Sequence, residues 1–266
     1  MAFGKRVGNP FGRVGGDEPA PSAWPPIERR PDLPNSRFIG LNLIQSGDGT
    51  KNESAESQQR IINLLIDAHR EERGVQAETI LSAVGALAGF AAQQAIWESV
   101  VKTGKMSSSQ IFIPIKVNGE QYYLGDFLNL ILASLKEGQL SIWRIVAGAL
   151  VKAEEGPMFD INPIAANIVK TMGTAAFGTP TWPDNEVLQE SPKQSLRHWP
   201  RIKTIFITAG DDPLHWSLKL AIAAQRLIEA SKGIIPAQKA AFIVMEAAIS
   251  MSKIDPRLVP GGSYVD

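Results

Sequence analysis

Apolar residues recur at intervals of three and four along most of this chain after residue 53. In QQRIINLLIDAHRE, for example, this spacing relates Ile61, Ile62, Leu65 and Ala68, which would line one face of a helix. Serine, asparagine or proline begins several of these stretches and glycine ends them, as is usual at helix termini. The pattern predicts seven helices, at about residues 53–73, 76–103, 127–137, 142–155, 162–173, 213–231 and 236–253.

The second of these helices is built largely from alanine and glycine. Its uncharged run, residues 79–97, almost reaches the length of a membrane span, but it contains two adjacent glutamines and few bulky apolar residues. A helix buried inside the protein is therefore the better interpretation, and no membrane span is expected. Gly85 and Gly89 lie one turn apart on this helix, so the backbone of another helix is expected to approach closely there.

The segment IFIPIKVNGEQYYLGD changes to the alternating pattern of a β-hairpin, with Asn118-Gly119 as a favoured two-residue turn. Pro114 cannot donate to a β-ladder, so the first strand is expected at a sheet edge. Tyr122 and Tyr123 are adjacent and would point to opposite faces, so one is expected to be buried and the other exposed for partner binding. The apolar face of the first strand would consist of Ile111, Ile113, Ile115 and Val117.

The expected fold is therefore mainly α (α+β), a helical domain of roughly seven helices with one small β-hairpin, spanning residues 36–266 as a single domain. Residues 1–35 contain seven prolines and five glycines without a periodic apolar face, which is typical of a flexible tail. Within this tail FGKRVG is followed by the similar FGRVGG. The similarity is either accidental in a solvated tail or marks a motif that docks on a partner or an anionic surface through Phe3, Lys5, Arg6, Phe11 and Arg13.

Composition and charge narrow the classes of function. The 266 residues contain 27 Lys plus Arg and 27 Asp plus Glu, so the formal net charge is zero and nucleic acid is not an expected partner. The chain has no cysteine, which excludes disulfides, thiolate nucleophiles and cysteine-ligated metals. The N-terminal residues lack the apolar core of a signal peptide, so a cytoplasmic location is expected.

Candidate chemistry is concentrated in RHWPRIKTIFITAGDDPLHW, residues 197–216, which holds two of the three histidines. His198, Asp211 and His215 are the candidate catalytic residues, and they would form an acid-base or metal site only if they converged. Asp212 followed by Pro213 is explained as a helix start, in which the carboxylate accepts backbone N–H groups.

Helical geometry separates the remaining candidates. His215 falls on the same side of its helix as Lys219, so it is expected to face solvent, whereas Trp216 is expected to face the core. The third histidine, His69, lies among charged residues near a helix C-terminus, where a solvated helix end is expected. No metal site and no cofactor are expected.

The sequence contains no common catalytic or cofactor-binding motif, and the functional hypothesis depends largely on this absence. No phosphate loop, dinucleotide-binding glycine pattern, HExxH zinc motif or G-x-S-x-G elbow occurs. The preferred hypothesis is a non-catalytic helical interaction or scaffold protein, whose tail docks on a protein partner and whose nearly all-apolar last helix is either internal or mediates self-association. The alternative is a small-molecule-binding protein or enzyme with a pocket bordered by residues 173–215, so enzymatic activity stays open.

Overall fold

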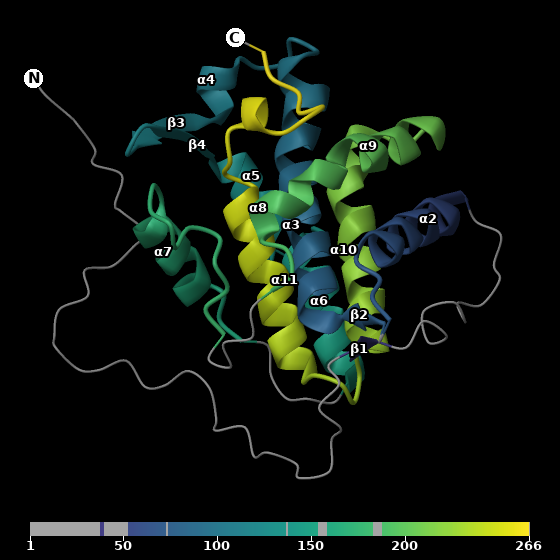
Figure 1. Cartoon of the computed structure of the whole chain (residues 1–266). Coiled ribbons are helices and arrows are strands. Elements are labelled where there is room, and N and C mark those ends of the chain that lie inside the picture. The colour runs from purple at the N-terminus through teal and green to yellow at the C-terminus, as the bar shows by residue number, and fades with distance from the viewer. Residues whose placement is uncertain are drawn as a thin grey trace, which may run out of the picture. The chain divides into compact units, whose positions relative to one another are not determined.

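The computed structural model describes residues 38–39, 53–72, 74–136, 138–153, 159–182 and 188–265. These residues are mainly helical, with two small antiparallel pairs of strands (Figure 1). Strand β1 (Phe38–Ile39) pairs with β2 (Val75–Gln76), and β3 (Ile113–Val117) pairs with β4 (Glu120–Leu124). The predicted mainly α fold with one β-hairpin is confirmed, whereas the boundary between tail and domain near residue 35 lies outside the described residues and stays a prediction.

All seven predicted helices are present. They are α2 (Glu53–Ala68), α3 (Ala77–Ile96), α5 (Asp126–Ala133), α6 (Ile142–Ala153), α7 (Asn162–Thr171), α10 (Pro213–Ala230) and α11 (Ala237–Met251). Helix α3 continues through a π-helical turn, η1 (Trp97–Val101), and the short helix α4 (Ser108–Ile111) precedes the hairpin.

One long helix was not predicted. Helix α9 (Trp199–Thr208) follows α8 (Pro192–Ser195) and the 3₁₀ turn η2 (Leu196–His198), and a further 3₁₀ turn, η3 (Pro256–Leu258), lies near the C-terminus. The β-branched run RIKTIFIT in α9 is compatible with either a strand or a helix. Its buried residues Ile202, Ile205 and Phe206 follow helical spacing, and their burial selects the helix.

Helix α3 forms the centre of the core and is buried along its whole length. Figure 1 shows it between α11 on one side and α10 on the other, and these two helices make its most extensive contacts. Side chains at Gly85 and Gly89 would overlap the carbonyl oxygens of Val244 and Ala248 in α11, so the predicted close backbone approach is confirmed. By length and composition α3 together with η1 would be long and apolar enough to cross a membrane, yet its residues are packed inside the protein.

Helix α11 is buried by its own chain, which decides between the two interpretations of its apolar surface. Its polar residues are covered as well: Lys239 forms an ion pair with Glu78 of α3 at 3.3 Å, and Glu246 accepts hydrogen bonds from Thr181. Burial raises the pKa of Glu246, against the lowering effect of those hydrogen bonds, and it lowers the pKa of Lys253 to about 8. The hypothesis of self-association was based on the apolar surface of this helix, and that surface is not exposed.

The hairpin turn is formed as predicted. Asn118 and Gly119 have φ angles of 49° and 87°, the positive values that this class of turn requires. Strand β4 pairs with β3 on one side and contacts the C-terminal segment on the other, where the Tyr123 N–H donates to the Lys253 carbonyl at 2.9 Å. Within the described residues β3, which contains Pro114, therefore lies at the edge of its sheet.

The predicted side-chain environment of the hairpin is wrong in two respects. Tyr122 and Tyr123 are both buried, because Tyr122 packs against Phe177 of the loop after α7 while Tyr123 packs against Trp97 of η1. Neither tyrosine is therefore available as the exposed partner-binding residue. The expected apolar face of β3 is not buried either: Ile113 is 63% exposed, Ile115 and Val117 are half-buried, and Ile111 belongs to α4.

The contact between α3 and α11 makes a direct prediction for stability. Gly89→Ala is expected to lower the free energy of unfolding by about 3 kcal/mol, because the added methyl group has to push the two backbones apart. Gly148→Ala is the matched control: in α6 the new methyl group would meet only the flexible Gln225 side chain, and the better helix propensity should add up to about 1 kcal/mol. Urea unfolding of both variants measures the difference, and equal effects would contradict this account of the core.

Candidate functional site

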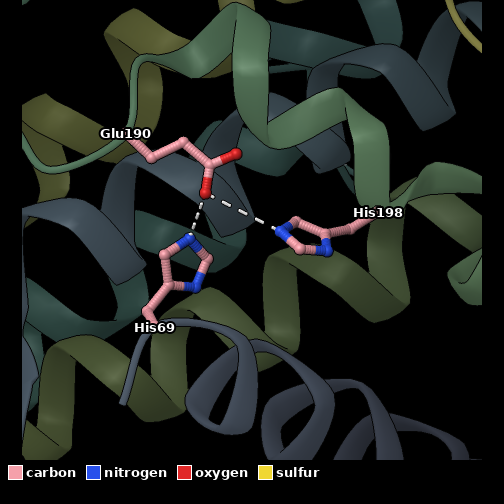
Figure 2. Close-up of side chains that lie close together, drawn as sticks. All are labelled: His69, Glu190 and His198. Carbon is pink, nitrogen blue, oxygen red and sulfur yellow. Dashed lines mark hydrogen bonds and ion pairs between the residues drawn. The ribbon is translucent and has the colours of Figure 1, made fainter. Parts of the chain in front are cut away.

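Three side chains from distant parts of the chain converge in a buried cluster (Figure 2). His69 lies directly after α2, Glu190 lies before α8, and His198 is the last residue of η2. The Nε2 atom of His69 is 2.6 Å from Oε2 of Glu190, and Nε2 of His198 is 3.7 Å from the same oxygen. The exposed fraction of the side chain is 3% for His69, 6% for Glu190 and 9% for His198, so the cluster is largely shielded from water.

The end of α2 orients the His69 ring. The His69 N–H donates to the carbonyl oxygens of Leu65 and Ile66, and the ring Nδ1 lies 2.8 Å from the Leu65 carbonyl oxygen. A carbonyl oxygen can only accept, so Nδ1 must carry a proton. Nε2 is thereby directed at the carboxylate of Glu190.

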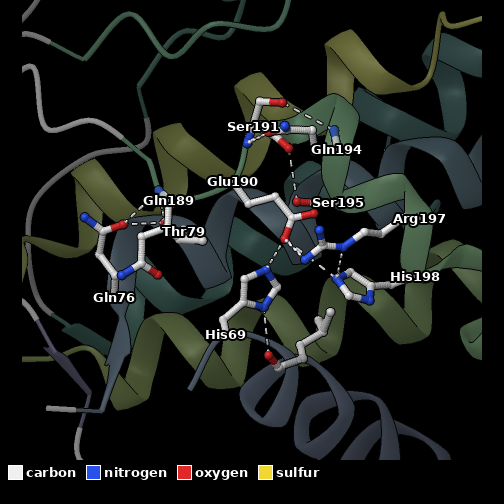
Figure 3. A network of polar contacts seen from close by, with 11 residues as sticks. His69, Gln76, Thr79, Gln189, Glu190, Ser191, Gln194, Ser195, Arg197 and His198 are labelled. Atoms are coloured by element: carbon white, nitrogen blue, oxygen red, sulfur yellow. Dashed lines mark hydrogen bonds and ion pairs between the residues drawn. The ribbon is translucent and has the colours of Figure 1, made fainter. Parts of the chain in front are cut away.

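The segment that carries Glu190 is fixed on both sides (Figure 3). On one side the Gln189 N–H donates to Oγ1 of Thr79 in α3 at 3.0 Å. On the other side Ser191 and Gln194 form a capping box: the Gln194 N–H donates to Ser191 Oγ, and the Ser191 N–H donates to Gln194 Oε1. Glu190 therefore lies between a contact to the central helix and a well-defined helix start.

A cation at the edge of the cluster contributes to its electrostatics. The Arg197 guanidinium donates through a terminal nitrogen to Glu190 Oε2 at 3.0 Å, and its side chain is 61% exposed. Burial alone raises the pKa of Glu190, but the neighbouring His198 and His69 rings and the charge of Arg197 outweigh it and lower the pKa to about 2. Glu190 is therefore a carboxylate at neutral pH. Its second oxygen, Oε1, is buried and has no hydrogen-bond partner within the described part of the chain.

The contact between His69 and Glu190 needs a positive charge. Nδ1 of His69 holds one ring proton, so Nε2 would otherwise direct a lone pair at a carboxylate oxygen only 2.6 Å away. A second ring proton removes that repulsion at the observed distance, and a metal ion bound to both atoms would remove it with the two atoms further apart. The ligand atoms of His69, Glu190 and His198 all lie within 4.8 Å of one another, and two imidazoles with one carboxylate form a recurring donor set for transition metals.

The residues singled out in the sequence do not converge. His198 belongs to the cluster, whereas Asp211 lies beyond the other end of α9, about 15 Å away for a ten-residue helix, where it pairs with Lys219. His215 is exposed and Trp216 is buried, both as predicted. Asp212 accepts a hydrogen bond from the backbone N–H of Leu214 and caps α10, which confirms its predicted role.

Two members of the cluster were misjudged or missed. His69 was expected at a solvated helix end, but it is buried, because the segment around Glu190 covers the end of α2. The sequence around Glu190 contains only a helix-start signal, the Ser191-Pro192 pair that follows it, and nothing that marks the glutamate itself. The candidate docking residues Phe3, Lys5, Arg6, Phe11 and Arg13 lie outside the described residues.

A cavity of about 440 Å³ is separate from the cluster, since neither His69, Glu190 nor His198 lines it. It is bordered by the hairpin turn and by residues of the 173–193 segment. Neither His198, Asp211 nor His215 lines it. The lining residues are Asn118, Glu120, Gly173, Thr174, Ala175, Phe177, Gly178, Thr179, Ser191 and Lys193.

Comparison with known proteins adds no assignment: no family model, curated protein or solved structure matches this chain. The fold and the cluster alone define its class. It is a mainly α protein in which a loop segment closes over the end of a helix and brings two histidines and one glutamate together.

The burial of Glu190 makes a prediction for the metal-free protein. In the presence of a chelator, Glu190→Gln is expected to lower the free energy of unfolding by about 3 kcal/mol, because it removes the charge that His69 and Arg197 surround. Glu229→Gln breaks the more exposed pair between Glu229 and Lys152 and should change it by less than about 1 kcal/mol. Urea unfolding compares the two, and an equally small effect at both sites would show that the cluster contributes nothing special to folding.

Proposed function

We propose that this chain is a metal-binding protein in which His69, Glu190 and His198 hold one divalent first-row transition metal ion. The observation that carries the proposal is the ring orientation of His69. Its Nδ1 donates to the Leu65 carbonyl, and its Nε2 faces a buried carboxylate. Metal-binding histidines commonly make this hydrogen bond to a backbone carbonyl, since it fixes the tautomer that binds through Nε2. The proposal replaces the expectation of no metal and no cofactor.

The donor set supports a zinc-like ion. Imidazole nitrogen and carboxylate oxygen suit Zn²⁺, and the chain has no thiolate to offer a softer metal. Oε1 of Glu190, which accepts no hydrogen bond from the described residues, gives the carboxylate a second oxygen for the ion. An ion pair between Glu190 and Arg197 would satisfy one glutamate oxygen, but it does not explain why two histidines are buried beside that oxygen.

Three protein ligands are typical of zinc sites that keep a position open for water or substrate, whereas structural zinc sites usually have four. The proposed site therefore favours the small-molecule-binding or enzymatic alternative over a purely structural role. Glu190 and His198 both come from the 173–215 segment that this alternative singled out. In the proposed site His69 and His198 bind the metal ion as neutral imidazoles, and Glu190 binds it as a carboxylate.

Zinc binding provides the test. Protein stripped with a chelator and titrated with ZnCl₂ against a fluorescent competitor is expected to bind one ion per chain, and His69→Gln and His198→Gln should each weaken binding by about 100-fold or more. His215→Gln is the matched control, because His215 is exposed and outside the cluster, and it should bind zinc like the wild type.

Circular dichroism of each zinc-free variant separates loss of a ligand from loss of fold. Two substitutions at different positions guard against one variant that fails to fold. Equal zinc affinity in the wild type, His69→Gln and His198→Gln would contradict the proposed site.

The near-repeat in the N-terminal residues favours a second, independent function. We propose that residues 1–35 dock on a protein partner through Phe3, Lys5, Arg6, Phe11 and Arg13, with the helical domain as the scaffold that carries them. The support is that an aromatic residue precedes basic residues and glycine twice within a short distance.

A pull-down with the full chain tests this docking function. Replacing Phe3 and Phe11 with alanine is expected to remove the same partner that is lost on deletion of residues 1–35, because each copy of the repeat loses its aromatic anchor. Ser22→Ala, within the same segment but outside the repeat, should retain the partner. If the double substitution and the deletion both leave the captured proteins unchanged, this second function is refuted.

A further inference from the structure

The Arg197 guanidinium donates hydrogen bonds to two of the three proposed metal ligands, His198 and Glu190 (Figure 3). Its Nε donates to Nε2 of His198 at 3.3 Å, and a terminal guanidinium nitrogen donates to Oε2 of Glu190 at 3.0 Å. These acceptors are the ring nitrogen and the carboxylate oxygen that lie 3.7 Å apart in the proposed metal site. One guanidinium therefore uses the lone pairs that a metal ion requires.

A metal ion and this guanidinium cannot share those lone pairs. Coordination requires distances of about 2.0 to 2.2 Å to nitrogen and oxygen, which leaves no room for an N–H donor directed at the same electron pairs. We propose that the Arg197 guanidinium holds the cation position in the metal-free protein, that an arriving metal displaces it, and that the displaced group then binds an oxyanion on the metal. This inference rests on the proposed metal site.

The exposure of the side chains supports the displacement. His69, Glu190 and His198 are buried, whereas the Arg197 side chain is 61% exposed. Arg197 is therefore the member of this group that can turn into water without uncovering the core. When the Arg197 side chain turns outward, it exchanges its two hydrogen bonds to the cluster for hydrogen bonds to water. The same movement opens the ligand atoms toward solvent.

The charges indicate the class of ligand that would follow. Glu190 supplies the single carboxylate among the four side chains, and with the metal bound it stands against a divalent ion and a guanidinium. Excess positive charge in a largely buried site is costly unless an anion joins it. A guanidinium beside an open coordination position suits a carboxylate or phosphate group, which can use one oxygen for the metal and another for the planar N–H donors.

Zinc affinity tests the displacement. In the competition titration Arg197→Gln is expected to bind zinc about tenfold more tightly than the wild type, because the competing charge-assisted hydrogen bonds are gone. Arg201→Gln is the matched control, since Arg201 is exposed four residues further on, and it should leave the affinity unchanged. A merely supporting arginine would give the opposite result, weaker zinc binding in Arg197→Gln, and that result overturns the inference, as does unchanged affinity.

The anion is tested on the cobalt-substituted chain. Inorganic phosphate, or separately acetate, is expected to change the visible absorption of the wild-type Co²⁺ protein, and Arg197→Gln should need about tenfold more anion for the same change. An equal response in both proteins, or no response in either, overturns this part of the inference.

The controls separate this inference from the proposed function. If His69→Gln loses zinc while Arg197→Gln matches the wild type, the metal site stands and the role of Arg197 fails. If the wild type itself binds no zinc, the proposed function fails first.

Discussion

The close backbone contact between α3 and α11 is the constraint on which the rest of this structure depends. Gly85 and Gly89 allow it, since any larger side chain would strike the carbonyl groups of α11. Two helices pressed together in this way are shielded from water, so their polar side chains need partners inside the protein. Gln93 of α3 accordingly donates to the Ser252 and Ile254 carbonyls, and this holds the chain after α11 against the central helix.

The same central helix positions the candidate site. Thr79 near the start of α3 accepts a hydrogen bond from the Gln189 N–H, so the segment before α8 is attached to the fully buried central helix. This attachment places Glu190 over the end of α2 and directs it at His69. A carboxylate buried in that way requires positive partners, and the low pKa of Glu190, about 2, is the consequence of having them despite its burial. The core thus creates the cluster by fixing where a loop can lie.

Local patterns in the sequence were sufficient for much of the fold. Helical spacing and terminal Gly and Pro residues located seven helices, and the Asn118-Gly119 pair located the hairpin. Helix α9 was missed because its β-branched residues suit a strand equally well. The burial of both Tyr122 and Tyr123 was missed because alternation along a strand does not reveal that other segments cover both faces.

The site was much less predictable, because it depends on contacts between distant segments. His69 and Glu190 are 121 residues apart, and nothing near His69 indicates that a loop will cover the end of its helix. Conversely, His198 and Asp211 are close in sequence but lie at opposite ends of helix α9, so they do not form a site together. Only His198 among the candidate catalytic residues belongs to the cluster.

The most direct test of the central claim is the zinc K-edge X-ray absorption spectrum of the chain loaded with one equivalent of Zn²⁺. The proposed site predicts scattering from two imidazole rings together with carboxylate oxygen, at distances of about 2.0 to 2.2 Å. A spectrum with oxygen neighbours alone and no imidazole scattering would contradict it, because zinc would then be bound without His69 and His198.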